Sequence, residues 1–371
     1  MEHLPEILKI INGALNSDID KVASYTTLLA DKLEKEGAMG ASKKIRTALD
    51  QSRTQKLSPA SIGFRNNVPV DNESKLSLAD KLYIEKGQIK VFFDNEIQEK
   101  CDCFVNYIKS SDKLLSQGVD FSPSLLLYGP PGCGKTELVK YIASELELPL
   151  VTARLDSLIS SFLGSTAKNI RGLFDFANSN PCILFLDEFD AIAKLRDDQH
   201  ELGELKRVVV SLLQNIDMLD QQTILIAATN HDHLLDPAIW RRFTYKIFID
   251  KPNELIREDM LAFFLESFLD KKDLKISANA CEGLSGAEIK EICNETKRQY
   301  VVNDQSCFKT SELLKRFAEV HLASIKFSGE LEDKIKQLRS FNSKIYTYRH
   351  LADIFDVSTG YLSKLFKEEE A

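Results

Sequence analysis

Short apolar runs alternate with amphipathic segments through the middle of the chain. Four of these runs read SLLLYG, PLVTARL, CILFLD and TILIAATN, at residues 124–129, 149–155, 182–187 and 223–230. Apolar residues at helical spacing occupy the segments between them, for example at 137–146 and 168–177. Continuous apolar runs of this length are typical of strands buried on both faces, and strands separated by helices pair in parallel. The pattern therefore predicts an α/β domain built on a parallel sheet.

The pattern is helical on both sides of this region. Apolar residues recur at helical spacing in residues 20–37, where Gly37 can cap the helix. Residues 57–75 are rich in Pro, Asn and Ser without periodicity, which predicts a linker. No proline follows Pro252, and helical patterns continue from there to the end. We expect a helical N-terminal domain at 1–56, a linker at 57–79, a large α/β domain at 80–251, a helical lid at 252–305 and a helical C-terminal region at 306–371.

Composition and charge limit the class of protein. The chain has 371 residues, of which 43% are hydrophobic, enough for two or three packed units. A net charge of -8 argues against a protein that coats nucleic acid. The seven cysteines are scattered and show no zinc spacing, and no stretch approaches 18 apolar residues. We expect a soluble cytoplasmic protein that is not inserted in a membrane.

A glycine-rich loop follows the first apolar run, where a strand is expected to lead into a helix. YGPPGCGKTE fits the G-x-x-x-x-G-K-[ST] pattern, whose backbone N–H groups surround phosphates at the start of the following helix. The lysine of this pattern reaches the β- and γ-phosphates, and the hydroxyl holds Mg²⁺. The sequence therefore predicts ATP and Mg²⁺ as ligands. The candidate nucleotide-binding residues are Gly129, Pro130, Pro131, Gly132, Cys133, Gly134, Lys135, Thr136 and Glu137, with Thr136 also a metal ligand.

Carboxylates follow the third apolar run. Asp187 is positioned to contact Mg²⁺, and Glu188 to orient and deprotonate a water. Asn230 ends the fourth run and is suited to positioning that water near the γ-phosphate. The alternatives are an exposed acidic strand end and a plain turn asparagine. A buried strand delivers its carboxyl end to the ligand-binding edge of such sheets, which favours ATP hydrolysis over binding alone.

These motifs, together with AATN and LLDPAIWRRF, resemble an AAA+ ATPase module over residues 88–300. The resemblance implies a parallel five-stranded P-loop sheet with a helical lid, and a ring, usually a hexamer, with nucleotide between subunits. It makes Asn230 the first sensor, and Arg241 and Arg242 candidate arginine fingers. The family more often separates these arginines by Pro-Gly. Arg242 is preferred because it keeps the Arg-Phe pair.

Two further segments resemble the protein-remodelling branch of this family. GLSGAEIKEI is similar to a small-residue second sensor, which implies that Gly286 and Ala287 lie against the nucleotide. SSFLGSTAKN is similar to the first pore loop, which implies that Phe162 and Leu163 grip a polypeptide. Ser165 stands where the family usually has Glu. The alternative for Phe162 is an ordinary buried side chain.

The C-terminal segment YRHLADIFDVSTGYLSKLFK resembles a helix-turn-helix with its turn at Asp356. The expected second helix carries only Lys364 and Lys367 as cations before an acidic end, which makes it a poor DNA reader. A helical docking or assembly module is therefore favoured over DNA binding.

The sequence thus predicts an ATPase that remodels or translocates a protein substrate. The alternatives are a DNA-associated AAA+ ATPase and a nucleotide-gated scaffold with negligible turnover. The layout is similar to bacterial AAA ATPases paired with a subtilisin-like serine protease in phage or plasmid defence, so antiviral defence is part of the hypothesis. The sequence contains neither H-E-x-x-H nor G-x-S-x-G, and any proteolysis is expected from a partner.

Overall fold

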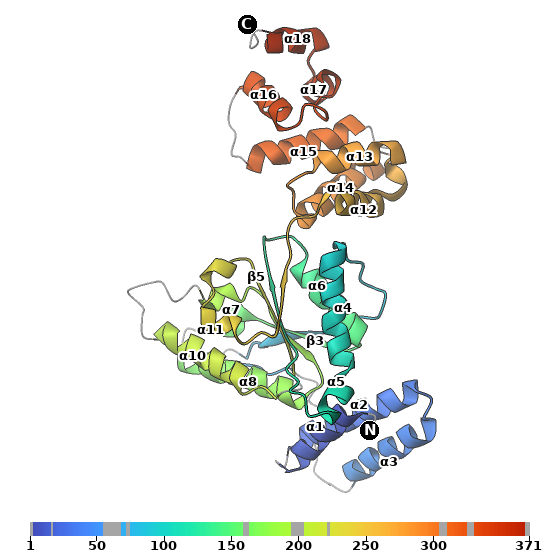
Figure 1. Cartoon of the computed structure of the whole chain (residues 1–371), viewed down its shortest axis with the longest axis vertical. Coiled ribbons are helices and arrows are strands. Elements are labelled where there is room, and N and C mark those ends of the chain that lie inside the picture. Colours follow the sequence, from blue (N-terminus) through green and yellow to red (C-terminus); the bar gives the residue numbers. More distant parts are fainter. Residues whose placement is uncertain are drawn as a thin grey trace. The chain divides into compact units, whose positions relative to one another are not determined.

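The structure is a computed structural model that describes residues 3–15, 18–54, 68–71, 75–158, 163–193, 204–220, 223–303, 310–324 and 330–367. The chain divides into two compact units. The first contains Met1–Val91, Asn95–Gly129 and Lys135–Ile249, and the second contains Phe92–Asp94, Pro130–Gly134 and Asp250–Ala371. Figure 1 labels many of their helices and some of their strands, and each unit is described here by itself.

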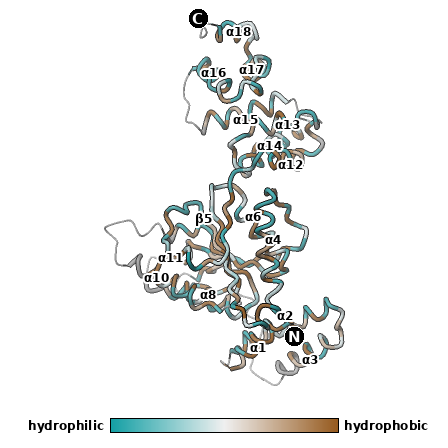
Figure 2. Tube along the Cα trace, viewed as in Figure 1, coloured by the Kyte–Doolittle hydropathy of each residue, from teal (hydrophilic) through white to brown (hydrophobic). Residues whose placement is uncertain are grey.

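A six-stranded sheet forms the centre of the first unit. Its strands are β1 (Ala79–Leu82), β2 (Ser124–Tyr128), β3 (Leu150–Ala153), β4 (Ile183–Leu186), β5 (Ile224–Thr229) and β6 (Tyr245–Phe248). They lie in the order β1-β3-β4-β5-β2-β6, with β1 antiparallel to β3 and every other pair parallel. Every residue of β4 and β5 is buried, and Figure 2 shows the central strands in the brown of hydrophobic residues. The four apolar runs therefore form strands as predicted.

The predicted count of five strands was one short. Five strands run parallel, and β1 is an additional antiparallel strand at the edge of the sheet. Its sequence, ADKL, alternates between buried and more exposed residues because an edge strand is only partly covered. A short strand of this kind lacks the continuous apolar run that reveals a central parallel strand.

Helices cover both faces of the sheet. In Figure 1, α4 (Asn95–Lys109) and α6 (Lys135–Leu146) lie on one side of it, and α8 (Leu163–Ser179) and α10 (Glu204–Asp217) on the other. Shorter helices of this unit are α5 (Ser111–Ser116), α7 (Leu155–Leu158), α9 (Asp190–Ala193), η2 (Asp232–Leu234) and α11 (Pro237–Trp240).

The N-terminal segment forms α1 (Leu4–Leu15), α2 (Ile19–Lys35) and α3 (Met39–Thr54). After α2 the chain turns at Gly37, whose positive φ of 84° supports its predicted capping role. The buried face of α1 carries charged residues. Glu6 and Lys9 are only 5% and 3% exposed, whereas the apolar Leu8 and Ile11 are 39% and 48% exposed. Ion pairs, not apolar packing, therefore dominate this face of α1.

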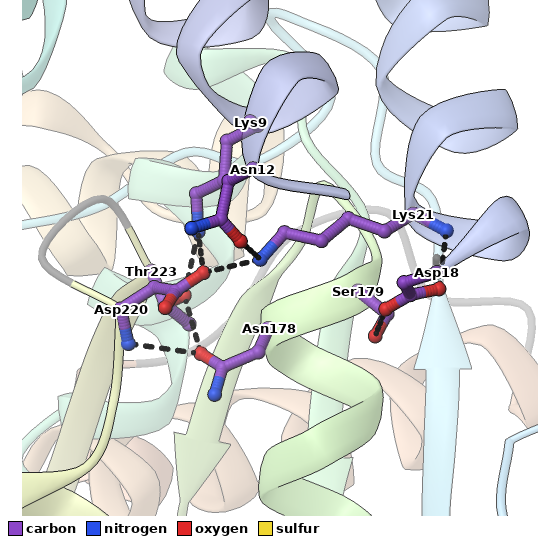
Figure 3. Close-up of polar contacts among 8 residues, drawn as sticks. All are labelled: Lys9, Asn12, Asp18, Lys21, Asn178, Ser179, Asp220 and Thr223. Carbon is purple, nitrogen blue, oxygen red and sulfur yellow. Dashed lines mark hydrogen bonds and ion pairs between the residues drawn. The ribbon is translucent and has the colours of Figure 1, made fainter. Parts of the chain in front are cut away.

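Two buried lysines converge on one aspartate beneath these helices, as Figure 3 shows. Lys9 Nζ donates to Asp220 Oδ2 at 3.1 Å and to Thr223 Oγ1 at 3.2 Å. Lys21 Nζ donates to the same Asp220 oxygen and to Asn12 Oδ1. Asn178 Oδ1 completes the cluster by accepting from the Asp220 N–H. The cluster fastens α1 and α2 to the segment that leads into β5.

Burial and pairing act in opposite directions on the protonation of this cluster. Burial lowers the pKa of Lys9 to about 8, although the charge of Asp220 favours the ammonium form. Burial also acts to raise the pKa of Asp220, but hydrogen bonds from Lys21 and Lys9 outweigh it, and the pKa is lowered. The ionised form of Asp220 is therefore stabilised by the two lysines that donate to it.

We expect Asp220→Asn to lower the free energy of unfolding by about 2–3 kcal/mol, because two buried ammonium groups would lose their counter-ion. This expected loss of stability is at the low end for breaking a buried ion pair, because the Asp220 side chain is 34% exposed and solvent screens its charge. Lys9→Met is the matched control. It keeps the pair of Lys21 and Asp220 and should change stability by less than about 1 kcal/mol. Melting temperatures check both values, and an unchanged Asp220→Asn protein would contradict the assigned role.

The second unit contains helices throughout its described residues after Pro252, as the lack of proline predicts. They are α12 (Glu254–Leu265), η3 (Glu266–Phe268), α13 (Lys271–Ala280), α14 (Gly286–Val302), α15 (Thr310–Ser324), α16 (Leu331–Phe341), α17 (Tyr348–Phe355) and α18 (Thr359–Lys367). One continuous apolar core joins α12 to α18. Asp356 links α17 and α18 in a left-handed conformation with φ 54° and ψ 45°, at the predicted turn. Of the helices that the structure describes, none is both long and apolar enough to cross a bilayer.

Candidate functional site

The carboxyl ends of three neighbouring strands bring candidate residues to one edge of the sheet. β4, β5 and β2 are adjacent and parallel. Asp187 and Glu188 follow β4, Asn230 follows β5 and Gly129 follows β2. Parallel order therefore gathers residues that are about a hundred positions apart in the sequence, at the edge where such sheets bind ligands.

Gly129 begins the glycine-rich loop in a conformation that a side chain would prevent. Its φ is 137°, and an added Cβ would lie 2.1 Å from the carbonyl oxygen of Ile249. Lys135 starts α6 on the far side of the loop and is 7% exposed. Its Nζ donates to the Gly129 carbonyl at 2.8 Å. The ammonium group is therefore held over the start of the loop, at the amino end of a helix.

Thr136 and Asp187 are in direct contact. The Thr136 hydroxyl donates to Asp187 Oδ2 at 3.0 Å, and Asp187 Oδ1 accepts the Glu188 N–H at 2.9 Å. A hydroxyl and a carboxylate at this edge are the oxygen ligands that Mg²⁺ prefers, so the residues present fit the ion. In the part of the chain that the structure describes, no group of three or more His, Cys, Asp or Glu residues could hold a metal. Phosphate oxygens and water can supply further Mg²⁺ ligands.

Glu188 is exposed and has a left-handed backbone with a φ of 48°. This conformation costs a residue other than glycine about 1–2 kcal/mol and is concentrated at functional sites. The neighbouring residues hold the turn, since the Phe189 N–H donates to the Ala228 carbonyl at 2.8 Å. The carboxylate of Glu188 is thereby presented to solvent beyond the strand end.

Asp190 joins this turn to the end of β5 and was not singled out from the sequence. It is 7% exposed, and its Oδ1 accepts from Thr229 Oγ1 at 2.9 Å and from the Asn230 N–H at 3.4 Å. The sequence did contain a signal for Asp190, which is the second aspartate of ILFLDEFD. A carboxylate this close to a buried strand needs a hydrogen-bond partner. Asp190 fixes Asn230 relative to the turn that carries Glu188.

The middle of the glycine-rich loop belongs to the second unit and contacts the start of α14. The Gly132 carbonyl accepts the Ala287 N–H at 2.9 Å. Gly132 has a φ of 73°, and an added Cβ would lie 2.8 Å from Ser285 Oγ. Gly286 is also in contact, since an added Cβ would lie 3.5 Å from the Gly132 carbonyl oxygen. The predicted second-sensor residues, Gly286 and Ala287, therefore lie against the loop.

The other loop residues differ in their surroundings. Cys133 is 8% exposed and donates its thiol to the Pro131 carbonyl at 3.6 Å. At Gly134 an added Cβ would lie 3.3 Å from the Phe93 ring. In the first unit, Glu137 pairs with Lys140 on the surface of α6. Loop residues 131 and 132 are exposed, and 130 is half-buried.

The two candidate arginines lie at the end of α11 with different contacts. Arg242 forms a two-pronged ion pair with Asp217 and donates to the Ala238 carbonyl. Arg241 is exposed. Of the predicted pore residues, Leu163 is the first residue of α8, and Phe162 lies outside the described residues.

Comparisons with known proteins identify the domain. Residues 125–251 match the family described as ATPase family associated with various cellular activities (AAA). An uncharacterized AAA family ATPase y4kL of Sinorhizobium fredii is 43% identical over 198 residues, 53% of this chain and 60% of that protein. Proteasome-activating nucleotidase 1 of Haloferax volcanii is 35% identical over 233 residues, which are 60% of this chain and 56% of that protein. ATP-dependent zinc metalloprotease FtsH 2 of Bdellovibrio bacteriovorus is 33% identical over 230 residues, which are 58% of this chain and 37% of that protein.

Residues 125–251 therefore match an AAA ATPase domain, and this match and the ATPase-named relatives support ATP hydrolysis. The chain spans less than two thirds of the length of each of these relatives.

Proposed function

We propose that the chain is a subunit of a ring, a hexamer on the family pattern, that uses ATP hydrolysis to remodel or translocate a protein substrate. The observation that carries the proposal is the strand edge where Thr136 contacts Asp187 and the strained turn presents Glu188. This edge places a metal-binding pair beside a candidate base, which is the arrangement that nucleotide hydrolysis requires.

Each residue has a distinct part in the proposed reaction. Lys135 binds the β- and γ-phosphates, and Glu188 accepts a proton as a water attacks the γ-phosphorus and ADP leaves. Asn230 orients that water. Thr136 and Asp187 would hold Mg²⁺, which would supply positive charge against the phosphates. Gly286 and Ala287 would lie beside the nucleotide, next to the glycine-rich loop that they contact.

The names of two relatives support a proposal for what the hydrolysis serves. One relative is named as a proteasome-activating nucleotidase and another as an ATP-dependent zinc metalloprotease. We propose that a separate protease partner receives the substrate. On the resemblance of the chain's layout, this partner is a subtilisin-like serine protease acting in phage or plasmid defence.

The C-terminal helices support docking better than DNA binding. The turn at Asp356 gives α17 and α18 the shape of a helix-turn-helix. Arg339 of the neighbouring α16, however, lies 4.3 Å above the Tyr348 ring and 5.4 Å from the Phe366 ring. This cation packs on two aromatic rings within the helical group, so it is engaged inside the segment instead of facing a phosphate. We propose an assembly role for this segment.

The test of the function is a pair of substitutions at Phe162. Phe162→Ala should keep ATP binding, assembly and basal turnover but lose stimulation of the ATPase by a permanently unfolded, reduced and carboxymethylated protein. Phe162→Tyr keeps the aromatic face and should retain that stimulation. If Phe162 is instead a core residue, the Ala variant will lose about 3–5 kcal/mol of stability, and turnover will fall with it. Stimulation by duplex DNA in place of the unfolded protein would favour the DNA-associated alternative.

A further inference from the structure

Apolar side chains form a ridge along the outer face of α1. They recur at intervals of four, three and four positions, so they lie on one side of the helix. The residues of this α1 ridge are Leu4, Leu8, Ile11 and Leu15. Leu4 is half-buried, and the other three are 39%, 48% and 81% exposed. The charged residues of α1, Glu6 and Lys9, are both buried, so the ridge itself carries no charge.

The ion-pair cluster beneath α1 fixes the ridge in this outward position. Lys9 lies on the face of α1 opposite to the ridge, and its Nζ donates to Asp220 at 3.1 Å (Figure 3). Turning the ridge inward would break the pairs that hold the buried ammonium groups of Lys9 and Lys21, which is costly. The fold therefore leaves leucine and isoleucine side chains in water. A contiguous apolar surface of this kind is characteristic of an interaction site.

The α1 ridge lies away from the nucleotide-binding edge of the sheet. Asp220 and Thr223, which accept from Lys9, precede β5, and Asn178 of the same cluster lies near the end of α8, before β4. The cluster thus holds α1 at the amino ends of these two strands. Asp187 and Glu188 follow the carboxyl end of β4. A molecule bound to the ridge would therefore leave those carboxyl ends open.

The spacing of the ridge is complementary to a second copy of itself. Intervals of four, three and four read the same in both directions, so an antiparallel α1 of another chain sets Leu8 against Ile11 and Leu4 against Leu15. Two uncharged ridges meet without like-charge repulsion. Antiparallel packing also places the amino end of each helix beside the carboxyl end of the other, where the partial charges of the two helix dipoles attract.

We propose that the α1 ridge joins two copies of this chain in an antiparallel contact about a two-fold axis. This contact is separate from the proposed ATPase function and does not require a ring. A helix of 12 residues offers a face about 18 Å long and about 10 Å wide, which is small beside the ~800 Å² that each partner buries in a standard interface. Single chains are therefore held weakly. Chains joined in a ring present several ridges at once, and linked contacts strengthen one another.

Charged substitutions test this contact through sedimentation velocity of the full chain. Ile11→Glu sets a carboxylate against the partner's apolar Leu8 and should lower the association constant at least about tenfold. Leu8→Lys should have the same effect. The double variant Leu8→Lys/Ile11→Glu sets each lysine against a carboxylate of the other chain, and it should return the constant to within about threefold of the parent value.

The same variants should keep the melting temperature and the ATP turnover of the parent protein, because both residues are exposed and lie away from the nucleotide-binding edge. Lys44→Glu is the control for added negative charge, since Lys44 is an exposed residue of α3. It should leave the association constant unchanged.

Disulfide cross-linking tests the register of the contact. Leu8→Cys chains mixed with Ile11→Cys chains should cross-link under mild oxidation, and so should Leu4→Cys chains mixed with Leu15→Cys chains. Leu8→Cys mixed with Leu15→Cys is the mismatched control, which should give at most about a tenth of the product because the two sulfur atoms lie too far apart. A size tag on one chain identifies the mixed product, and the parent chain measures the background from native cysteines.

Equal yields from matched and mismatched mixtures would overturn the proposal. So would a parent protein whose sedimentation stays constant over about a hundredfold range of concentration, because association follows mass action. Flotation of the parent with phosphatidylcholine vesicles, if Ile11→Glu abolishes it, would assign the ridge to a membrane and also contradict pairing. A chain that forms no ring is still expected to pair, so failure of the proposed ring and failure of this contact give different results.

Discussion

Glu188→Gln is expected to bind ATP with Mg²⁺ normally and to hydrolyse it at least about 100-fold more slowly than the parent protein. An amide has nearly the shape of the carboxylate but cannot accept a proton from the attacking water. The backbone at this position has a φ of 48°, and the substitution leaves that strain unchanged. The loss should therefore appear in turnover and not in stability.

Phosphate release and the binding of a fluorescent ATP analogue measure the two properties separately. Glu99→Gln is the matched control, because Glu99 is an exposed residue of α4, a helix that contributes none of the candidate site residues. It should turn over like the parent. Near-normal hydrolysis by Glu188→Gln would refute the role assigned to this carboxylate. Such a result would leave the AAA ATPase domain in need of another base.

Lys135→Ala is expected to weaken ATP binding about 100-fold or more, since charge-assisted hydrogen bonds to phosphate contribute about 1.5–3 kcal/mol each. The side chain is 7% exposed and its Nζ already lies over the loop, at 2.8 Å from the Gly129 carbonyl. Little rearrangement is needed for it to reach a phosphate. Turnover should be lost because the substrate no longer binds.

Thermal melting with and without ATP provides the measurement. ATP should raise the melting temperature of the parent protein, because a ligand that binds only the folded state stabilises it. Lys135→Ala should lose this shift. Lys140→Ala changes a lysine of the same helix that pairs with Glu137 at the surface, and it should keep the shift. A full ATP-dependent shift in Lys135→Ala would contradict the phosphate-binding role.

Local patterns in the sequence determined much of this protein. The continuous apolar runs predicted the central parallel strands, because residues buried on both faces must be apolar whatever their partners. Gly37 and Asp356 marked turns that the structure contains. The spacing of Gly129, Lys135 and Thr136 predicted a strand-to-helix loop, since that conformation depends on the loop's own residues.

Only the tertiary structure decided the remaining features. The edge strand β1 has no apolar run, and its pairing with β3 depends on a segment far along the chain. Lys9 and Lys21 are buried because Asp220 lies beneath them, although a lysine in isolation is expected on the surface. Arg241 and Arg242 are identical in type and adjacent in sequence, and their difference arises from Asp217, 25 residues away. Ion pairs between distant elements follow from packing, which periodicity along the chain does not encode.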